Sequence, residues 1–134
     1  NPSGFSILSQ RDGGKRETAM KQSDRQRMIK IIEAGRRLLD YVKAQNITEA
    51  DIEQSYAVQW TITTPLYNIG EHTYQLSKEM KSKYPDVPWS QIAGMRHRLV
   101  HQYDDTNWHI VSLVVFDELE KYIKQLEKIL PEIE

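Results

Sequence analysis

The chain has 134 residues, a length that suits one folded domain with a single hydrophobic core. Its formal net charge of −1 excludes an overall positive field for holding nucleic acid, so any contact with RNA must be a local patch. The absence of cysteine excludes disulfides, thiolate catalysis and cysteine-ligated zinc. No apolar run approaches the roughly 20 residues that span a bilayer, and the N-terminus does not resemble a signal peptide. We therefore expect a cytoplasmic protein.

The first segment, residues 1–19, combines proline, paired glycine and scattered charge without a sustained period. This composition predicts a disordered leader or an expression remnant, with Met20 as a candidate native start. We expect a single helical domain over residues 20–134.

The first strong helical pattern extends from Ser23 to about Ala44, with Ser23 or Asp24 as the candidate N-cap. Its apolar residues recur every three or four positions and form one stripe: Met28, Ile31, Ile32, Gly35, Leu38, Leu39 and Val42. A second start signal follows at Thr48, because Asp51 comes three residues later in a short-acid variant of the capping box.

The segment from Thr48 to about Lys83 predicts one long helix or two stacked ones. Its inward positions have approximate helical spacing: Ile52, Tyr56, Trp60, Leu66, Ile69, Thr73, Leu76 and Met80. The β-branched run 61–64 is followed by Pro65, which predicts a kink or break near Thr64. A short hairpin there would have no partner strand.

Two further helices complete the chain. The first covers about 89–103 and is followed by a capping turn at 104–107. The second covers about 108–130 and stops at Pro131, and the apolar run in its first half predicts burial on more than one side. These patterns together predict an all-α fold, a bundle of four or five helices.

For the isolated histidines and the tryptophans, a structural role explains the residue better than a functional one. His72 and His109 suit surface or hydrogen-bonded positions. The three tryptophans, Trp60, Trp89 and Trp108, are more typical of a core or an interface than of base-stacking platforms. The pair at 104–105 resembles half of a carboxylate site, but a helix-capping turn explains it better.

The stretch from Arg96 to Tyr103 concentrates polar chemistry, with two arginines, two histidines and a tyrosine. On a straight helix, residues five apart lie about 140° from each other, and those seven apart lie within about 20°. Arg96 and Tyr103 would therefore share a face, with His101 to one side. Arg96 and His101 can converge only if the helix end unwinds or if a second chain supplies the other group.

The residues alone leave three interpretations open. Histidine can exchange protons near neutral pH and arginine can stabilise a crowded phosphate, so the set suits metal-independent RNA cleavage through the ribose 2′-OH. Alternatively, Arg96 is a surface or ion-paired residue and His101 stabilises the helix C-terminus. His97 and His101, four apart, could also bind zinc, although no glutamate lies between them and further ligands are unidentified.

Arg96, four residues, His101, one residue and Tyr103 form an Arg-x4-His-x-Tyr pattern, with polar His97 directly after the arginine. This pattern resembles the motif of the HEPN superfamily, and most closely that of the HepT-type toxins. The segment 88–103 is similar to HepT over its whole length, and Ile69-Gly70-Glu71 is similar to another family segment. The resemblance covers roughly residues 24–130 in helix order.

The resemblance implies a HEPN-type up-down bundle that dimerises through the motif helix, and an endoribonuclease toxin that needs no metal or cofactor. In it, Arg96 would bind and stabilise the phosphate, His101 would transfer protons and His97 would orient or assist. Tyr103 would be the residue to which a nucleotidyltransferase antitoxin (MntA-type) transfers AMP. The added charge and bulk would obstruct RNA and so neutralise the toxin.

Two alternatives come from other functional classes. The first is a non-catalytic helical partner module that binds a nucleotidyltransferase or a nucleotide and cleaves nothing. The second is a structural helical dimer in which the motif caps helices.

Overall fold

The computed structural model describes residues 13–101 and 105–133, with side chains at 23–100 and 105–133. All secondary structure within these ranges is helical, which confirms the all-α prediction. The elements in chain order are α2 (Gly13–Ala44), α3 (Glu49–Gln54), α4 (Tyr56–Gln75), α5 (Lys78–Lys83), α6 (Trp89–His101), α7 (Trp108–Leu113), the π-helix η2 (Val114–Glu118), α8 (Leu119–Ile129) and the 3₁₀ turn η3 (Leu130–Glu132).

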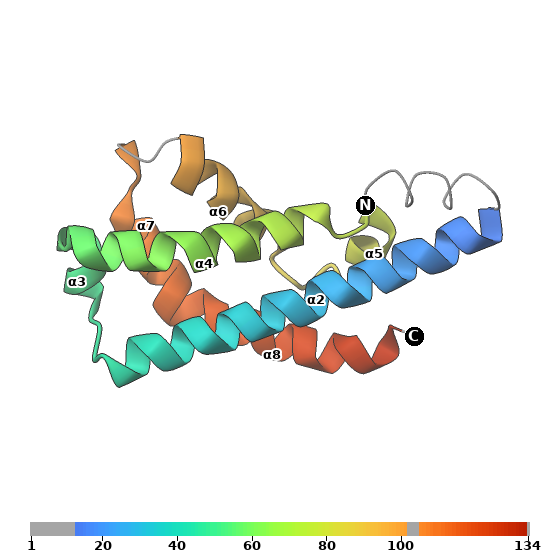
Figure 1. Ribbon diagram of the computed structural model, residues 1–134, viewed down its shortest axis with the longest axis horizontal. Helices are drawn as coiled ribbons and strands as arrows, with labels where there is room; N and C mark the ends of the chain where they lie inside the picture. Colours follow the sequence, from blue (N-terminus) through green and yellow to red (C-terminus); the bar gives the residue numbers. More distant parts are fainter. Residues whose placement is uncertain (1–12, 102–104, 134) are drawn as a thin grey trace.

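The helices form an up-down bundle. Figure 1 shows α2, α4 and α8 along the long axis, with α4 running opposite to α2 and α6 lying across α4. The main helix pairs are α4 with α6, α2 with α4, α2 with α8, and α3 with α7. Because α4 contacts both α2 and α6, it is the support on which the motif helix rests.

The core is aliphatic, with one buried tyrosine. Tyr122 on α8 is fully buried, and its hydroxyl shares a hydrogen bond of 2.6 Å with the hydroxyl of Thr73 on α4. Burial raises the pKa of Tyr122. Gly35 lets α8 approach α2 closely, since a Cβ there would lie 2.3 Å from Ile123 Cδ1. These contacts fix α8 beneath both α2 and α4.

The predicted stripe on α2 is confirmed, with Met28, Ile31 and Leu38 buried. The predicted start of this helix at Ser23 is wrong, because α2 already begins at Gly13. Asp24 is therefore no N-cap of α2. Its carboxylate instead accepts hydrogen bonds from the backbone N–H and the hydroxyl of Ser77, at 2.9 and 2.6 Å, and so ties α2 to the start of α5. Residues 1–12 lie outside the described ranges, and the division between 1–19 and 20–134 stays a prediction.

The start signal at Thr48 is confirmed, since Thr48 and Asp51 form both hydrogen bonds of a capping box on α3. Of the predicted kink or break near Thr64, the break is wrong, because α4 continues through Pro65, and the kink stays a prediction. In the run before Pro65, the hydroxyls of Thr61 and Thr63 each donate to the carbonyl four residues earlier, at 2.8 and 2.6 Å, which is compatible with a continuous helix. The chain breaks instead on either side of α4, where Ser55 and Ser77 cap the helices that follow.

Two inward positions predicted on α4 are also wrong. Tyr56 and Trp60 are 73% and 64% exposed, and their rings stack on each other with centroids 6.1 Å apart. Trp89, in contrast, is buried and packs edge-on against Tyr122. Helical spacing placed Tyr56 and Trp60 on an apolar face, but no described element covers that face.

The C-terminal helix follows the prediction with one irregularity. The Asn107 side chain accepts hydrogen bonds from the first turn of α7, which confirms the capping turn. Burial of the apolar run is confirmed in part, because Val111, Val114 and Val115 are buried whereas Phe116 is exposed. The helix widens at η2 and ends at Ile129, after which η3 contains the proline. Within the described residues, no helix has the length and apolarity needed to cross a membrane.

Candidate functional site

The motif helix α6 lies unusually close to α4. The contact is made at Gly70, where a Cβ would lie 2.9 Å from the backbone nitrogen of Arg96 and 3.1 Å from the carbonyl oxygen of Ile92. Both are backbone atoms that cannot rotate away, so a side chain at this position would separate the helices. Glycine at position 70 therefore allows the backbone of α6 at Arg96 to lie directly against α4.

The Arg96 side chain is held by two residues of α4. Its guanidinium carbon lies 3.7 Å from the centre of the Tyr74 ring, a cation–π contact. Its Nε lies 3.8 Å from a carboxylate oxygen of Glu71. The Arg96 and Glu71 side chains are 29% and 32% exposed, so the pair is partly open to solvent. Neither terminal nitrogen of Arg96 bonds to any other described side chain, and these fork-like donors suit a phosphate.

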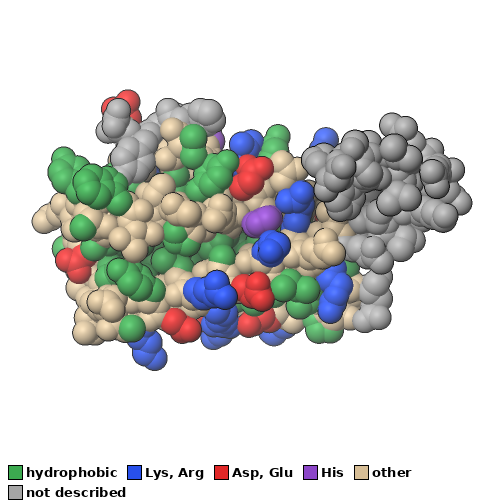
Figure 2. Space-filling model, viewed as in Figure 1, with side chains coloured by type: hydrophobic (Ala, Val, Ile, Leu, Met, Phe, Trp, Pro, Cys, Tyr) green, Lys and Arg blue, Asp and Glu red, His purple; other side chains and the backbone are tan. Residues whose placement is uncertain are grey.

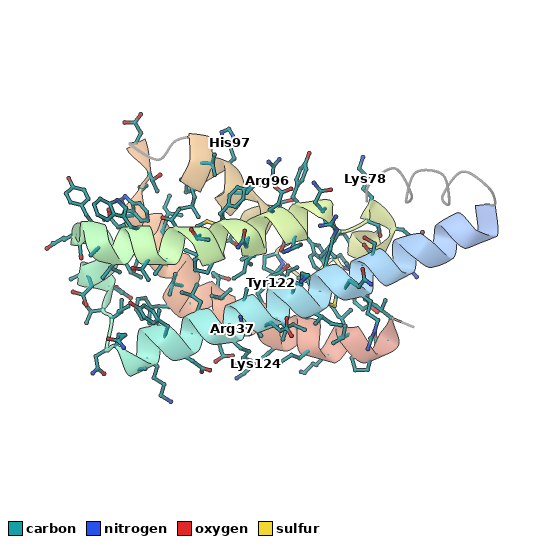
Figure 3. The ribbon with its side chains drawn as sticks, in the orientation of Figure 1. Arg37, Lys78, Arg96, His97, Tyr122 and Lys124 are labelled. Atoms are coloured by element: carbon teal, nitrogen blue, oxygen red, sulfur yellow. The ribbon has the colours of Figure 1, made fainter. Side chains whose placement is uncertain are left out.

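His97 follows Arg96 on α6 and is exposed. Figure 3 shows both side chains on the upper side of the molecule, away from the core residue Tyr122. On a helix, consecutive residues differ by about 100° in direction, so His97 and Arg96 point to neighbouring faces rather than to one point. The structure therefore places His97 where it can contact a ligand that spans the outer surface of α6.

The other two predicted site residues are not placed. His101 is the last residue of α6, and its side chain lies outside the described residues, as does the whole of Tyr103. The convergence of Arg96 with His101, and the position of Tyr103, thus stay predictions.

Sequence reasoning missed the role of Tyr74. The available signal was its position on α4 three residues after Glu71, which places both on one helix face. The segment around Gly70 and Glu71 was noted through its family resemblance, but its contact with the motif was not predicted. The contact joins two helices, so spacing within either helix could not reveal it.

A metal site has no support among the described side chains, where no three His, Asp or Glu residues gather as ligands. The zinc interpretation of His97 and His101 depends on the undescribed His101 side chain and stays a hypothesis. His72 and His109 occupy hydrogen-bonded positions as predicted. His72 contacts Arg27 at 3.3 Å, and exposed His109 contacts Glu53 at 3.3 Å.

A small helical bundle that presents a fixed arginine on an exposed motif helix has the architecture expected of a HEPN-type ribonuclease. The chain belongs to the ribonuclease HepT-like family, whose sequence model matches residues 28–129. This match confirms the predicted family and the prediction of a ribonuclease. The matched range covers α3–α8 completely, together with about half of α2.

Individual relatives agree with the family match. A "putative RNase" of Methanocaldococcus jannaschii is 30% identical over 90 residues, which are 67% of this chain and 74% of the relative. A "putative RNase" of Caldanaerobacter subterraneus subsp. tengcongensis is 40% identical over 62 residues, so the chain spans about half, 55%, of that relative. The "probable ribonuclease HepT" of Thermococcus cleftensis is 24% identical over 82% of this chain and 98% of its own length. No solved structure matches the chain.

Proposed function

We propose that the chain is the toxin of a bacterial toxin–antitoxin pair, a metal-independent endoribonuclease that acts as a homodimer. The observation that carries this proposal is the fixed Arg96, supported from below by Gly70 and from the side by Tyr74 and Glu71. An arginine held in place binds a phosphate with little loss of side-chain freedom, which favours stabilisation of a transition state.

The proposed reaction is attack by a ribose 2′-oxygen on the adjacent phosphorus. The 2′-OH proton passes to a base, the bond to the 5′-oxygen breaks, and the leaving oxygen takes up a proton. His101 is the proposed proton-transfer residue, because imidazole can accept and donate protons near neutral pH. Arg96 stabilises the charge on the phosphorane, and His97 orients the strand.

Exposed apolar side chains near Arg96 support the homodimer. Tyr74 is 52% exposed and Val100 on α6 is 50% exposed, while Tyr56 and Trp60 extend the same side of α4. Exposed apolar residues that gather on one side are typical of a protein interface. A second copy placed here would bring its own motif helix next to Arg96, so that the two motif helices line one cleft. It would supply the group that one helix cannot place beside Arg96.

The oligomeric state can be tested with one charge in this patch. Val100→Glu should shift the chain from dimer to monomer in light scattering, because an unpaired carboxylate would be buried at the interface. Tyr41→Glu, on the far part of α2, is the matched control and should leave the dimer unchanged. A wild-type chain that is monomeric at all concentrations would contradict the dimer.

Regulation by a nucleotidyltransferase antitoxin belongs to the same proposal. Transfer of AMP to the phenol oxygen of Tyr103 would add phosphate charge beside the cleft and repel RNA. Intact mass after co-expression with such an enzyme should increase by multiples of AMP, and Tyr103→Phe should abolish the increase. No modification would instead favour the non-catalytic partner module.

The catalytic role of Arg96 can be tested by substituting it and, as a control, a second arginine on the same helix. Arg96→Ala should lower RNA cleavage by about 10²- to 10³-fold, the usual effect of removing one group that stabilises charge in the transition state. Arg98→Ala removes the same charge two positions away and should change cleavage little. Cleavage should persist in a chelator. Wild-type cleavage by Arg96→Ala or by His101→Ala would refute the catalytic roles.

A further inference from the structure

A second group of basic side chains lies away from the motif, on the face of α2 that borders α4. Arg27, Lys30 and Arg37 are separated by three and seven residues, so they lie along one side of the helix. Figure 2 shows several lysine and arginine side chains on the viewed face, with a histidine beside two of them; α4 itself contains no lysine or arginine. The net charge of the chain is −1, so a local group of cations does not follow from an overall excess of basic residues.

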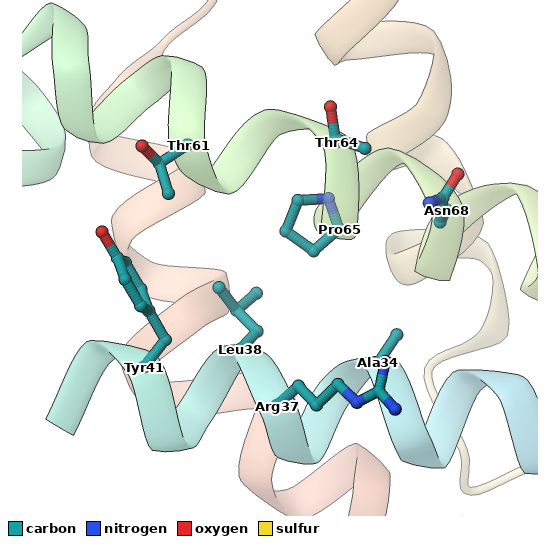
Figure 4. A pocket seen from close by; sticks show the side chains of 8 residues that line it. All are labelled: Ala34, Arg37, Leu38, Tyr41, Thr61, Thr64, Pro65 and Asn68. Carbon is teal, nitrogen blue, oxygen red and sulfur yellow. The ribbon is translucent and has the colours of Figure 1, made fainter. Parts of the chain in front are cut away.

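A groove separates the two helices beside this group. It has a volume of about 300 Å³, which reaches the lower end of small-ligand sites. Its lining comes equally from α2 and α4 (Figure 4): Ala34, Arg37, Leu38, Tyr41, Thr61, Thr64, Pro65 and Asn68. The floor is apolar, whereas the rim carries guanidinium, hydroxyl and amide groups. This combination suits a ligand with an anionic group and a flat or sugar-like body.

Arg37 differs sharply from its neighbour Arg36. Arg36 is bound by two carboxylates of α8, at 2.7 Å from Glu120 and 2.6 Å from Glu127. Arg37 is exposed and makes no ion pair or hydrogen bond within the described part of the chain. Its side chain extends along the groove toward Ala34 (Figure 4). An arginine without a carboxylate partner at the edge of a groove is available to an external anion.

Pro65 helps to form the groove. Proline has no N–H, so the carbonyl of Thr61 lacks its usual partner in the helix. The pyrrolidine ring occupies the groove wall instead of a longer side chain, between Thr61 and Asn68. The side chains of Thr64 and Asn68 are exposed and bond to no other described residue. Figure 4 shows the Thr64 hydroxyl and the Asn68 amide on the side of α4 that points away from α2, so these polar groups lie at the outer rim of the groove rather than opposite Arg37.

Contacts on α4 connect the basic residues of α2 with the motif arginine. His72 lies one turn after Asn68 on α4 and contacts Arg27 at 3.3 Å. Burial lowers the pKa of His72, and the positive charges of Arg27 and Lys30 lower it further while Glu71 opposes them. Glu71 in turn contacts Arg96 on α6. The cations of α2 and the motif arginine thus lie on neighbouring faces of α4.

We propose that the groove between α2 and α4 is a second binding site for single-stranded RNA, which holds one phosphate with Arg37 and guides the strand toward the motif. The identity of the ligand rests on the proposed ribonuclease function. Tyr41 lies at the end of the groove and is 40% exposed, so its ring offers a surface on which a base can stack. Arg27 and Lys30 lie on the same helix as Arg37 but outside the groove lining, where they would attract further phosphates of an RNA strand.

The test uses the full chain and a fluorescein-labelled, unstructured RNA in which every ribose is 2′-O-methylated. This probe cannot react through its 2′-oxygen, so binding is measured without cleavage. Fluorescence anisotropy gives the affinity at several salt concentrations. Arg37→Ala should weaken binding by about three- to tenfold and reduce the slope of log affinity against log salt by about 0.7, the value for one lost phosphate contact on a single strand.

Lys124→Ala is the matched control, because it removes one exposed positive charge from α8, whose residues do not line the groove; Figure 3 labels both Arg37 and Lys124. It should change affinity less than twofold. The double variant Lys30→Ala and Arg37→Ala should reduce the slope further. If Arg37→Ala and Lys124→Ala have the same affinity for the RNA and the same salt dependence, the proposal is overturned.

This outcome is separable from the cleavage proposal. A dinucleotide has a single phosphodiester, which must lie at the motif to be cleaved, so Arg37→Ala should cleave it at the wild-type rate while its KM for long RNA rises. If the wild-type chain binds the methylated RNA through Arg37 but cleaves no RNA, the ribonuclease proposal is refuted, whereas the groove is supported as an RNA-binding site. If the wild-type chain cleaves long RNA and Arg37→Ala leaves both KM and binding unchanged, only the proposal of an RNA-binding groove is refuted.

Discussion

The contact between α4 and α6 makes a sharp prediction at Gly70. In Gly70→Ala, the new methyl carbon would lie 2.9 Å from the Arg96 nitrogen and 3.1 Å from the Ile92 oxygen. Both neighbours belong to the backbone of α6, so relief requires the helices to move apart. Overpacking of this kind costs about 1–3 kcal/mol. Alanine is favoured over glycine inside a helix by about 1 kcal/mol, which offsets part of that cost.

Gly94 provides the matched control. It also lies within α6, but a Cβ there would meet nothing within 4 Å. Gly94→Ala should therefore stabilise the chain by about 1 kcal/mol through helix propensity alone. Gly70→Ala should be less stable than Gly94→Ala by about 1–3 kcal/mol, because the two variants differ in the contact and not in the chemical change.

Urea unfolding followed by circular dichroism measures this difference, with the oligomeric state of each variant checked at the same concentration. RNA cleavage is the second readout. A displacement of Arg96 by about 1 Å can lower cleavage by about 10²-fold even where the fold is retained. Equal stabilisation by both alanines would refute the close approach, and unchanged cleavage in a destabilised Gly70→Ala would refute its role in positioning Arg96.

Three further predictions concern contacts away from the motif. Tyr122→Phe should cost about 1–3 kcal/mol in urea unfolding because it leaves the buried Thr73 hydroxyl unpaired, and adding Thr73→Val should recover most of this loss. Arg36→Met should cost about 1 kcal/mol at low salt and less in 1 M salt, since its ion pair with Glu127 is partly exposed; an equal cost at both salts would contradict this. The lowered pKa of His72 means that the unfolded chain takes up this proton first, so stability should fall as pH drops below about 6.5, and His72→Gln should flatten that part of the profile.

Local signals in the sequence predicted local structure well. The capping residues Thr48 and Asn107 were identified because a cap depends on neighbours within three residues. The break at Pro65 was predicted wrongly, because residues on both sides of the proline, Ile62 and Leu66, are buried in the core, and tertiary packing overrides the local preference. The start of α2 was placed too late because Ser23 and Asp24 were interpreted as an N-cap, whereas the Asp24 carboxylate bonds to Ser77, a contact that local sequence does not reveal.

Burial was less predictable than helix position. Periodicity identified the stripe through Leu66 and Ile69, which is buried, but it assigned Trp60 to the same face. Helical spacing tells which residues share a side and not whether another element covers that side. The exposed Trp60 and Tyr56 mark a face of α4 that the described chain leaves open, where the proposed second copy would lie.

The same limit applies to the charges. A net charge of −1 predicted that any RNA contact must be local, but it could not tell which cations are available. Arg36 and Arg37 are adjacent and chemically identical, yet the helix rotates them to different neighbours. Arg36 meets two carboxylates of α8, whereas Arg37 faces the groove with no acidic partner among the described residues. RNA affinity in this near-neutral chain should therefore depend on which arginines remain unpaired, and charge changes at Arg37 and Arg36 should affect different properties: binding in the first case, stability in the second.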